Sequence, residues 1–261
     1  MTPSIALTVA GSDPSGGAGI QADLKTFAAF EVYGAAVITC ATAQNTTGVR
    51  AVHELPAVFV AAELDAVLDD LAVGAAKSGM LGSAAIVEVV AERFARAGAP
   101  PLVVDPVMVA TSGDRLIHDD AVAVVRARLL PCARLVTPNL AEAAVLSGRP
   151  VASDAERRDA ARAIRDLGAG AVLVKGGHAS GPATDLLLDA DGFEEIAGER
   201  LDVGPLHGAG CTLSAAIAAG IACGRDLRAA VRDAKRFVGE AIRRAPAVGR
   251  GARPLDHRAR R

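Results

Sequence analysis

Short apolar runs alternate with longer amphipathic segments along most of the chain. The apolar runs contain few polar residues, which is typical of strands buried on both faces of a sheet. We expect strands at Ile5–Ala10, Ala35–Thr42, Ala75–Gly79, Leu102–Asp105, Arg134–Thr137 and Ala171–Lys175. We expect helices at Ile20–Phe30, Ala57–Leu71, Ala84–Ala97, Asp119–Leu130 and Ser153–Leu167. This alternation predicts an α/β fold with a mostly parallel sheet covered by helices on both faces.

The last third of the chain departs from this alternation. Thr184–Asp189 and Phe193–Ala197 flank an Asp-Gly turn, which predicts a β-hairpin. We expect two further helices, at Gly210–Ala222 and Asp226–Ala245. Residues 243–261 are rich in Arg, Pro and Gly, and we expect them to form a partly flexible tail. We expect residues 1–261 to form a single domain, because single cores grow to roughly 250–300 residues.

Composition excludes several classes of protein. Hydrophobic residues make up 51% of the chain and charged residues 22%, so the chain is not of the disordered type. A net charge of −2 and an aromatic content of 3% give no basic field and few stacking side chains for nucleic acid. Four cysteines in 261 residues do not indicate a disulfide scaffold. Because we find no leader and no membrane-spanning run, we expect a cytoplasmic protein that binds neither nucleic acid nor membrane.

A glycine-rich loop follows the first expected strand. In sheets of this kind ligands bind at the carboxyl ends of the strands. The loop Gly11–Gly19 can bring its backbone close to a ligand, but it matches neither the Walker A loop nor the dinucleotide fingerprint. A flexible turn is the alternative interpretation. Asp23 lies one turn into the following helix, where it can face the cleft.

Two further strand ends carry side chains that suit an organic ligand. Gln44 both donates and accepts hydrogen bonds, which suits the edge of an aminopyrimidine, although polar loops after strands are ordinary. Met80 is either an adaptable apolar pocket wall or a core residue.

Oxygen-bearing side chains follow the next two strands. Asp105 ends a buried strand, where a carboxylate needs a cation or hydrogen-bond donors. Asn139 and Glu142 have the spacing of a helix capping box, yet they lie at the same sheet edge. Together these oxygens would suit a Mg²⁺ ion carried by a nucleotide. Lys175, at another strand end beside two glycines, can reach a phosphate.

Gly208, Ala209 and Gly210 open a helix, with Cys211 in its first turn. Free backbone N–H groups and the helix dipole meet there and can hold the charge of a transferring phosphoryl group. We expect the same position to lower the pKa of Cys211 below about 8.5, so that its thiolate could take a proton from a hydroxyl. A small buried cysteine under a glycine-rich cap is the alternative.

The order of these stretches resembles the ribokinase-like superfamily, and within it the hydroxymethylpyrimidine/phosphomethylpyrimidine kinases of thiamine biosynthesis. The resemblance covers about residues 5–245. The matching stretches are Ala10–Phe27, Val37–Gly48, Lys77–Leu81, Val104–Met108, Val136–Glu142, Lys175–His178 and His207–Ala216. Related sugar kinases and most pyridoxal kinases carry Asp where this chain has Cys211. The resemblance implies a three-layer α/β/α fold and a homodimer.

The resemblance also implies a reaction and its residues. It implies transfer of phosphate from ATP, with Mg²⁺, to 4-amino-5-hydroxymethyl-2-methylpyrimidine and then to its monophosphate. It implies pyrimidine contacts from Gln44 and Asp23, and pocket walls from Gly11, Met80 and Val107. It implies a nucleotide side formed by Lys175, Asn139 and Glu142, with Asp105 and Glu142 toward the metal. It implies an anion hole at Gly208–Gly210 and a base at Cys211.

Two departures from the family pattern leave alternatives open. Ala209 stands where the family usually has Thr, and Pro205 with Leu206 replaces an Asn-Thr pair. The backbone donors of the anion hole are unaffected by the first change. The alternatives are a pyridoxine- or pyridoxal-type kinase of the same superfamily, and a pyrimidine-binding homologue with weakened catalysis.

Overall fold

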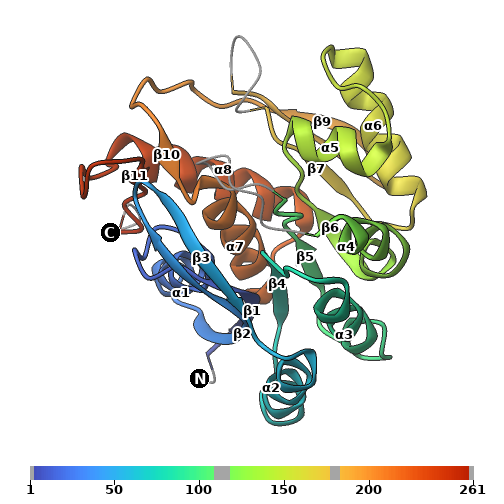
Figure 1. Ribbon diagram of the computed structural model, residues 1–261. Coiled ribbons are helices and arrows are strands. Elements are labelled where there is room, and N and C mark those ends of the chain that lie inside the picture. The colour runs from blue at the N-terminus through green and yellow to red at the C-terminus, as the bar shows by residue number, and fades with distance from the viewer. Residues whose placement is uncertain (1–2, 109–117, 177–182, 259–261) are drawn as a thin grey trace.

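The computed structural model describes residues 3–108, 118–176 and 183–258, and within them a nine-stranded sheet forms the centre of the molecule (Figure 1). The strand order is β3-β2-β1-β4-β5-β6-β7-β8-β9. The strands are β1 (Ile5–Ser12), β2 (Tyr33–Asn45), β3 (Gly48–Glu54), β4 (Ala75–Ser78), β5 (Leu102–Val104), β6 (Ala133–Val136), β7 (Val172–Val174), β8 (Asp185–Asp189) and β9 (Gly192–Ile196). A separate two-stranded sheet pairs β10 (Leu206–His207) with β11 (Arg253–Pro254).

The centre of the large sheet is parallel, as expected, and its edges are antiparallel. Strands β2, β1, β4, β5, β6 and β7 pair in parallel. The expected hairpin is present as β8 and β9. An additional edge strand, β3, pairs antiparallel with β2 and was not expected, because most of its side chains are exposed and its sequence lacks an apolar run.

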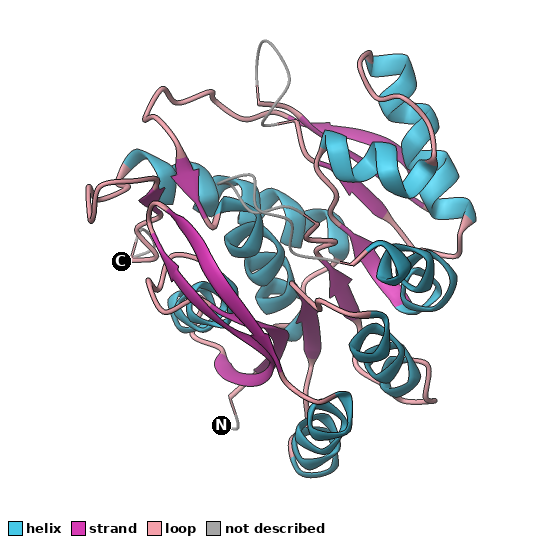
Figure 2. Cartoon of the chain, viewed as in Figure 1, coloured by secondary structure: helices cyan, strands magenta, loops and turns pink. Residues whose placement is uncertain are grey.

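Helices cover both faces of the sheet (Figure 2). They are α1 (Gly19–Ala29), α2 (Ala57–Asp70), α3 (Ala84–Phe94), α4 (Asp119–Val124), α5 (Leu140–Ser147), α6 (Asp154–Asp166), α7 (Ala209–Ala222) and α8 (Leu227–Arg243). The expected helix at Asp119–Leu130 changes to a π-helical turn at Val125–Leu129. Helices α1, α7 and α8 pack on one face and α2 to α6 on the other, so the three-layer α/β/α architecture is confirmed.

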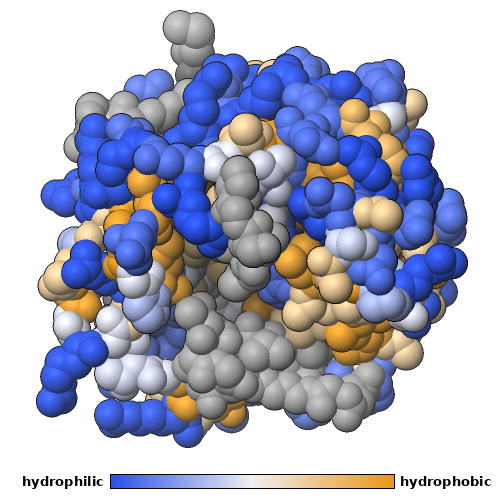
Figure 3. All heavy atoms as spheres, turned by 90° about the horizontal axis from the view of Figure 1, so that it is seen from above, coloured by the Kyte–Doolittle hydropathy of each residue, from blue (hydrophilic) through white to orange (hydrophobic). Residues whose placement is uncertain are grey.

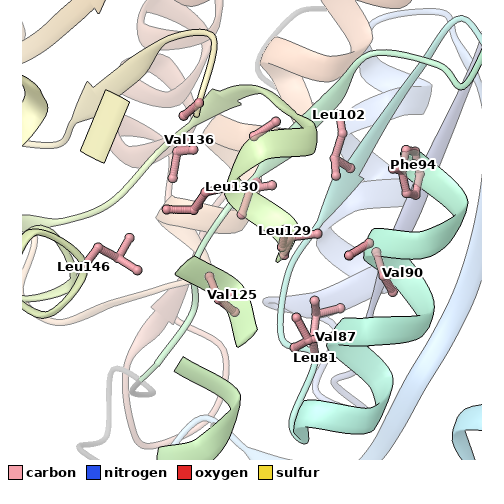
Figure 4. Close-up of a cluster of buried hydrophobic side chains, with 14 of the residues drawn as sticks. Leu81, Val87, Val90, Phe94, Leu102, Val125, Leu129, Leu130, Val136 and Leu146 are labelled. Carbon is pink, nitrogen blue, oxygen red and sulfur yellow. The ribbon is translucent and has the colours of Figure 1, made fainter. Parts of the chain in front are cut away.

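Each face of the sheet has its own hydrophobic core. Side chains alternate between the faces of a strand, so Leu102 and Val104 join the core under α3 while Val103 joins the core under α7. Figure 4 shows the first of these cores, where Leu102 lies opposite Val90 and Phe94 of α3. Burial on both faces explains why the central strands have few polar residues.

Part of the C-terminal segment packs against the domain, within residues 243–261 for which the sequence predicted a partly flexible tail; residues 259–261 lie outside the described residues. Leu255 is 3% exposed and His257 is 8% exposed. The Ala252 N–H donates to the Thr46 carbonyl at 2.8 Å, and β11 pairs with β10. Apolar burial and backbone pairing therefore outweigh the high Arg, Pro and Gly content of this segment.

Candidate active site

A cavity of about 1040 Å³ opens at the carboxyl ends of the parallel strands. This volume lies at the upper end of the range for small-molecule sites. The following expected site residues line it: Gly11, Gln44, Met80, Asp105, Val107, Asn139, Glu142, Lys175, Gly208, Ala209, Gly210 and Cys211. Figure 3 views this side of the molecule, where polar side chains cover most of the surface and apolar side chains form smaller patches. The sequence thus identified the lining of one continuous cavity.

The amino end of α7 forms one wall of the cavity. Gly208 caps the helix with a φ of 83°, and a Cβ atom there would lie 1.8 Å from the Gly17 carbonyl oxygen. Only glycine tolerates both conditions, which fixes the helix start against the glycine-rich loop. The first-turn N–H groups of Ala209, Gly210 and Cys211 have no acceptor within the helix. These donors point toward the cavity in the arrangement that an anion-binding site requires.

Lys175 lies next to this helix start and between two carboxylates. Its Nζ is 2.9 Å from Asp105 Oδ1 and 3.8 Å from Glu142 Oε2. Burial alone would lower the pKa of Lys175, but Asp105 and Glu142 reverse that effect and raise it. A Cβ atom on Gly210 would lie 3.2 Å from Lys175 Nζ, so the cation and the helix start are close together. The two features can act on the same anionic group.

Asn139 and Glu142 form the capping box of α5. Asn139 Oδ1 accepts from the Glu142 N–H at 2.9 Å, and Glu142 Oε2 accepts from the Asn139 N–H at 2.8 Å. Burial raises the pKa of Glu142. Both residues also line the cavity, so the capping box does not take them away from it.

The donor set at this edge can be tested against Mg²⁺. Among the described residues no group of three or more His, Cys, Asp or Glu side chains forms a ready-made metal site. Asp105 and Glu142 nevertheless supply two carboxylates beside Lys175. Because Mg²⁺ is commonly held by one or two carboxylates plus substrate phosphates and waters, these residues fit an ion that arrives with a nucleotide.

Cys211 lines the cavity, but its thiol is not activated as the sequence suggested. Burial raises its pKa to about 11, although Lys77 acts in the opposite direction. The Gly19 N–H donates to the sulfur and also lowers the pKa, without offsetting burial. The expected lowering of this pKa is therefore wrong, because loss of hydration outweighs the helix start and the neighbouring cation.

Asp23 does not line the cavity, which corrects its expected contact with a ligand. It is fully buried, and its Oδ2 accepts from Lys77 Nζ at 2.9 Å and from Thr8 Oγ1 at 2.6 Å. Asp23 raises the pKa of Lys77, although burial alone would lower it. Lys77 itself lines the cavity, so Asp23 acts on the site through this lysine.

Two further polar residues of the cavity, Asp13 and His207, were not identified from the sequence. His207 Nε2 lies 2.8 Å from Asp13 Oδ2 and 3.2 Å from Gln44 Nε2. All three side chains line the cavity. Asp13 and His207 are 194 positions apart in the chain, so sequence spacing carried no signal that they meet. Their presence in two of the glycine-containing stretches was the one available indication.

No helix among the described residues is long and apolar enough to cross a membrane. The four cysteines are free thiols. Cys40 is buried, and Cys223 is exposed. Of the four, Cys211 is the one that lines the cavity.

Comparisons with known proteins agree with this geometry. A hydroxymethylpyrimidine/phosphomethylpyrimidine kinase from Rhizobium meliloti is 53% identical over 258 residues, which is 97% of each chain. The crystal structure of an ADP complex of Bacillus subtilis pyridoxal kinase has a TM-score of 0.92 at 36% identity, covering 99% of this chain and 98% of the other. A Clostridium difficile phosphomethylpyrimidine kinase has a TM-score of 0.82 at 39% identity, covering 91% of this chain and 99% of the other. The model of the phosphomethylpyrimidine kinase family matches residues 13–256, and the chain belongs to this family.

Proposed function

We propose that the protein transfers phosphate from ATP to 4-amino-5-hydroxymethyl-2-methylpyrimidine and then to the resulting monophosphate, in thiamine biosynthesis. The observation that carries this proposal is one cavity that joins Gln44, Cys211, Lys175 and the amino end of α7. A relative with this activity in its name, the Rhizobium meliloti protein, covers 97% of the chain at 53% identity.

The pyrimidine lies at the β1–β2 side of the cavity in this proposal. Gln44 hydrogen-bonds to its polar edge, while Gly11, Met80 and Val107 enclose the ring. A Cβ atom on Gly11 would lie 2.7 Å from Cys40 Sγ, so the wall is already tightly packed behind the ring. Asp23 holds Lys77 in place instead of touching the ring.

The phosphates lie between Lys175 and the amino end of α7. The N–H groups at Gly208, Ala209 and Gly210 and the Lys175 ammonium balance the charge of the transferring group. Asn139 and Glu142 face the nucleotide, and Asp105 and Glu142 would hold Mg²⁺. When bound, the ion would neutralise charge on the nucleotide phosphates.

Cys211 is the proton acceptor for the first phosphorylation. With a pKa of about 11 only a small fraction of the thiol is ionised at neutral pH. That thiolate takes the hydroxymethyl proton as the oxygen attacks the γ-phosphorus. The second step uses a phosphate oxygen that is already ionised, so it needs no base. The two steps should therefore differ in their dependence on Cys211.

The cellular setting follows from the same chemistry. Use of ATP and four free cysteines support a cytoplasmic location. The protein acts as a homodimer in this proposal, supported by the exposed apolar side chains Val58 and Phe59 on α2. Light scattering of the purified protein measures this directly.

Turnover with ATP and Mg²⁺ tests the main proposal. The pyrimidine alcohol and its monophosphate should both yield product, and Cys211→Ala should lose most of the first activity while still binding the alcohol.

The 0.92 TM-score to a pyridoxal kinase favours one second candidate, phosphorylation of pyridoxal. A kcat/KM for pyridoxal above that for the pyrimidine alcohol would replace the main proposal with this candidate. Binding of the pyrimidine without any product would instead indicate a homologue with weakened catalysis.

A further inference from the structure

Gln44 is held between two side chains in the cavity wall. As placed in the structure, its amide Nε2 lies 3.2 Å from His207 Nε2 and its amide Oε1 lies 3.1 Å from Thr42 Oγ1. The oxygen and nitrogen ends of a glutamine amide have nearly the same shape, so the neighbours decide which end is which. These two contacts therefore determine which hydrogen bonds Gln44 offers to a ligand.

The His207 contact selects the oxygen end of the amide. Asp13 Oδ2 lies 2.8 Å from His207 Nε2. Burial opposes ionisation of Asp13, but hydrogen bonds from His207, Ser15 and the Ala18 N–H hold its pKa at about 2. A carboxylate only accepts hydrogen bonds, so His207 Nε2 carries a proton and donates. A second neighbour of this same nitrogen is then favourable only if it is an acceptor, which is the amide oxygen of Gln44.

The Thr42 contact selects the same orientation independently. The Thr42 hydroxyl has one proton and two oxygens within donating distance, the Ser12 carbonyl at 2.9 Å and, with the amide as placed, Gln44 Oε1 at 3.1 Å. The Ser12 carbonyl can only accept, so the proton goes to Ser12. The remaining capacity of the Thr42 hydroxyl is to accept, so its second neighbour is a donor. The favourable arrangement therefore turns the amide by half a rotation from its placed orientation, so that the NH₂ group of Gln44 faces Thr42. The amide oxygen then faces His207, as the Asp13 contact requires.

We propose that Asp13, His207 and Thr42 lock the Gln44 amide in this one orientation, and that the lock makes the site select a 4-aminopyrimidine over its 4-oxo analogue. This inference rests on the proposed function. The locked amide keeps one N–H and one oxygen lone pair for the ligand, in a fixed order. A 4-aminopyrimidine presents a ring nitrogen that accepts and an amino group that donates. The 4-oxo analogue presents an N–H that donates and a carbonyl that accepts.

An unlocked glutamine would not discriminate between these two ligands. It could turn by half a rotation and match either pattern with the same two hydrogen bonds. A locked glutamine leaves buried groups unpaired against the oxo analogue, which is the kind of mismatch that gives large discrimination. His207 and Thr42 are thus positioning residues that set specificity through Gln44.

The test compares kcat/KM for the 4-amino alcohol and for its 4-oxo analogue. We expect the unchanged protein to favour the amino compound by at least about 100-fold. His207→Leu should reduce that ratio at least about tenfold, mainly through KM. His207→Gln keeps an N–H donor for Asp13 and should restore the ratio to within about threefold of the unchanged protein. Thr42→Val removes the second lock and should reduce the ratio by a smaller factor.

His53→Leu is the matched control, because His53 is an exposed residue of β3 outside the cavity lining. It should leave the ratio unchanged. An unchanged ratio in both His207→Leu and Thr42→Val, with normal melting temperatures, overturns the inference. If His207→Leu does not fold, the ratio in Thr42→Val alone decides. If the unchanged protein phosphorylates neither compound, the proposed function fails, and the ratio of calorimetric Kd values without ATP still decides the inference.

Discussion

Lys77 Nζ lies 2.9 Å from Asp23 Oδ2, and neither side chain is exposed to solvent. Removal of one partner from a buried ion pair leaves an uncompensated charge and costs about 3–5 kcal/mol. We therefore expect Lys77→Met and Asp23→Leu each to lower the free energy of unfolding by about this amount. The double variant should recover much of the loss, because no buried charge is then left unpaired. Urea unfolding of the three variants measures this coupling.

An exposed ion pair is the control for this cycle. Arg162 and Asp159 are 2.8 Å apart on α6, and each side chain is 55% exposed. Asp159→Asn should change the free energy of unfolding little, because solvent screens such a pair. If the double variant loses as much free energy of unfolding as the Lys77 and Asp23 variants lose together, the buried pair is not coupled.

The raised pKa of Cys211 predicts an alkylation rate that keeps rising at high pH. Thiolate is the reactive form, so the rate should increase about tenfold per pH unit from pH 7 to pH 10. The measurement uses iodoacetamide and mass spectrometry in a variant in which Cys132 and Cys223 are replaced by Ala. A rate that levels off below pH 9 would contradict a pKa of about 11.

The two phosphorylation steps should respond differently to the loss of Cys211. Cys211→Ala should lower kcat for the pyrimidine alcohol by about 10²–10⁴-fold, the range typical of general base catalysis. For the monophosphate, whose attacking oxygen is already ionised, the loss should be about tenfold or less. Separate assays with each substrate give the two values. Equal losses in both assays would remove the base role and leave Cys211 as a packing residue.

Much of the fold could be predicted from the sequence because its central strands are buried on both faces. Leu102, Val103 and Val104 are all apolar, since each faces one core or the other. Strand β3 lies at the edge of the sheet, and most of its side chains are exposed to solvent. Its sequence therefore lacks an apolar run, and the strand was not predicted. The packing of the C-terminal segment was not predicted because it depends on pairing with β10, and that partner is distant in the sequence.

The residues of the candidate site likewise divide into those that could be predicted from the sequence and those that could not. Residues at strand ends, such as Gln44 and Lys175, could be identified because a parallel sheet brings these ends together. The burial of Asp23 and the raised pKa of Cys211 could not, because both depend on how residues distant in the sequence pack around these side chains. The contact between Asp13 and His207 likewise joins two ends of the chain.

Lys175 should matter more for ATP than for the pyrimidine. Lys175→Met removes the cation between Asp105 and Glu142 and leaves two buried carboxylates beside the phosphate position. We expect kcat/KM for ATP to fall by about 10²–10³-fold, with a much smaller change in pyrimidine binding. Lys175→Arg keeps the charge and should retain part of the activity.

Lys25→Met is the matched control for this comparison, because Lys25 is exposed and contacts the Gly16 carbonyl outside the cavity lining. Its kcat/KM for ATP should be nearly normal. Steady-state kinetics with each substrate varied in turn separate the two affinities. A Lys175→Met protein with normal kcat/KM for ATP would exclude a phosphate contact.

His257 should make the stability of the protein depend on pH between about 6.5 and 4. Its Nε2 lies 3.0 Å from Thr212 Oγ1 of α7, and burial lowers its pKa to about 4, with Lys25 acting in the same direction. The unfolded chain binds a proton near pH 6.5 and the folded chain only near pH 4, so the stabilisation is complete above 6.5 and is lost as the pH falls through this window. The loss in the free energy of unfolding should reach about 2–3 kcal/mol.

Urea unfolding at several pH values measures how steeply the free energy of unfolding changes with pH. In this window the slope for His257→Gln should correspond to about one proton fewer taken up on unfolding than in the unchanged protein or in His53→Gln. Equal sensitivity in all three proteins would mean that His257 is protonated while folded, and the neutral contact with Thr212 would then be wrong.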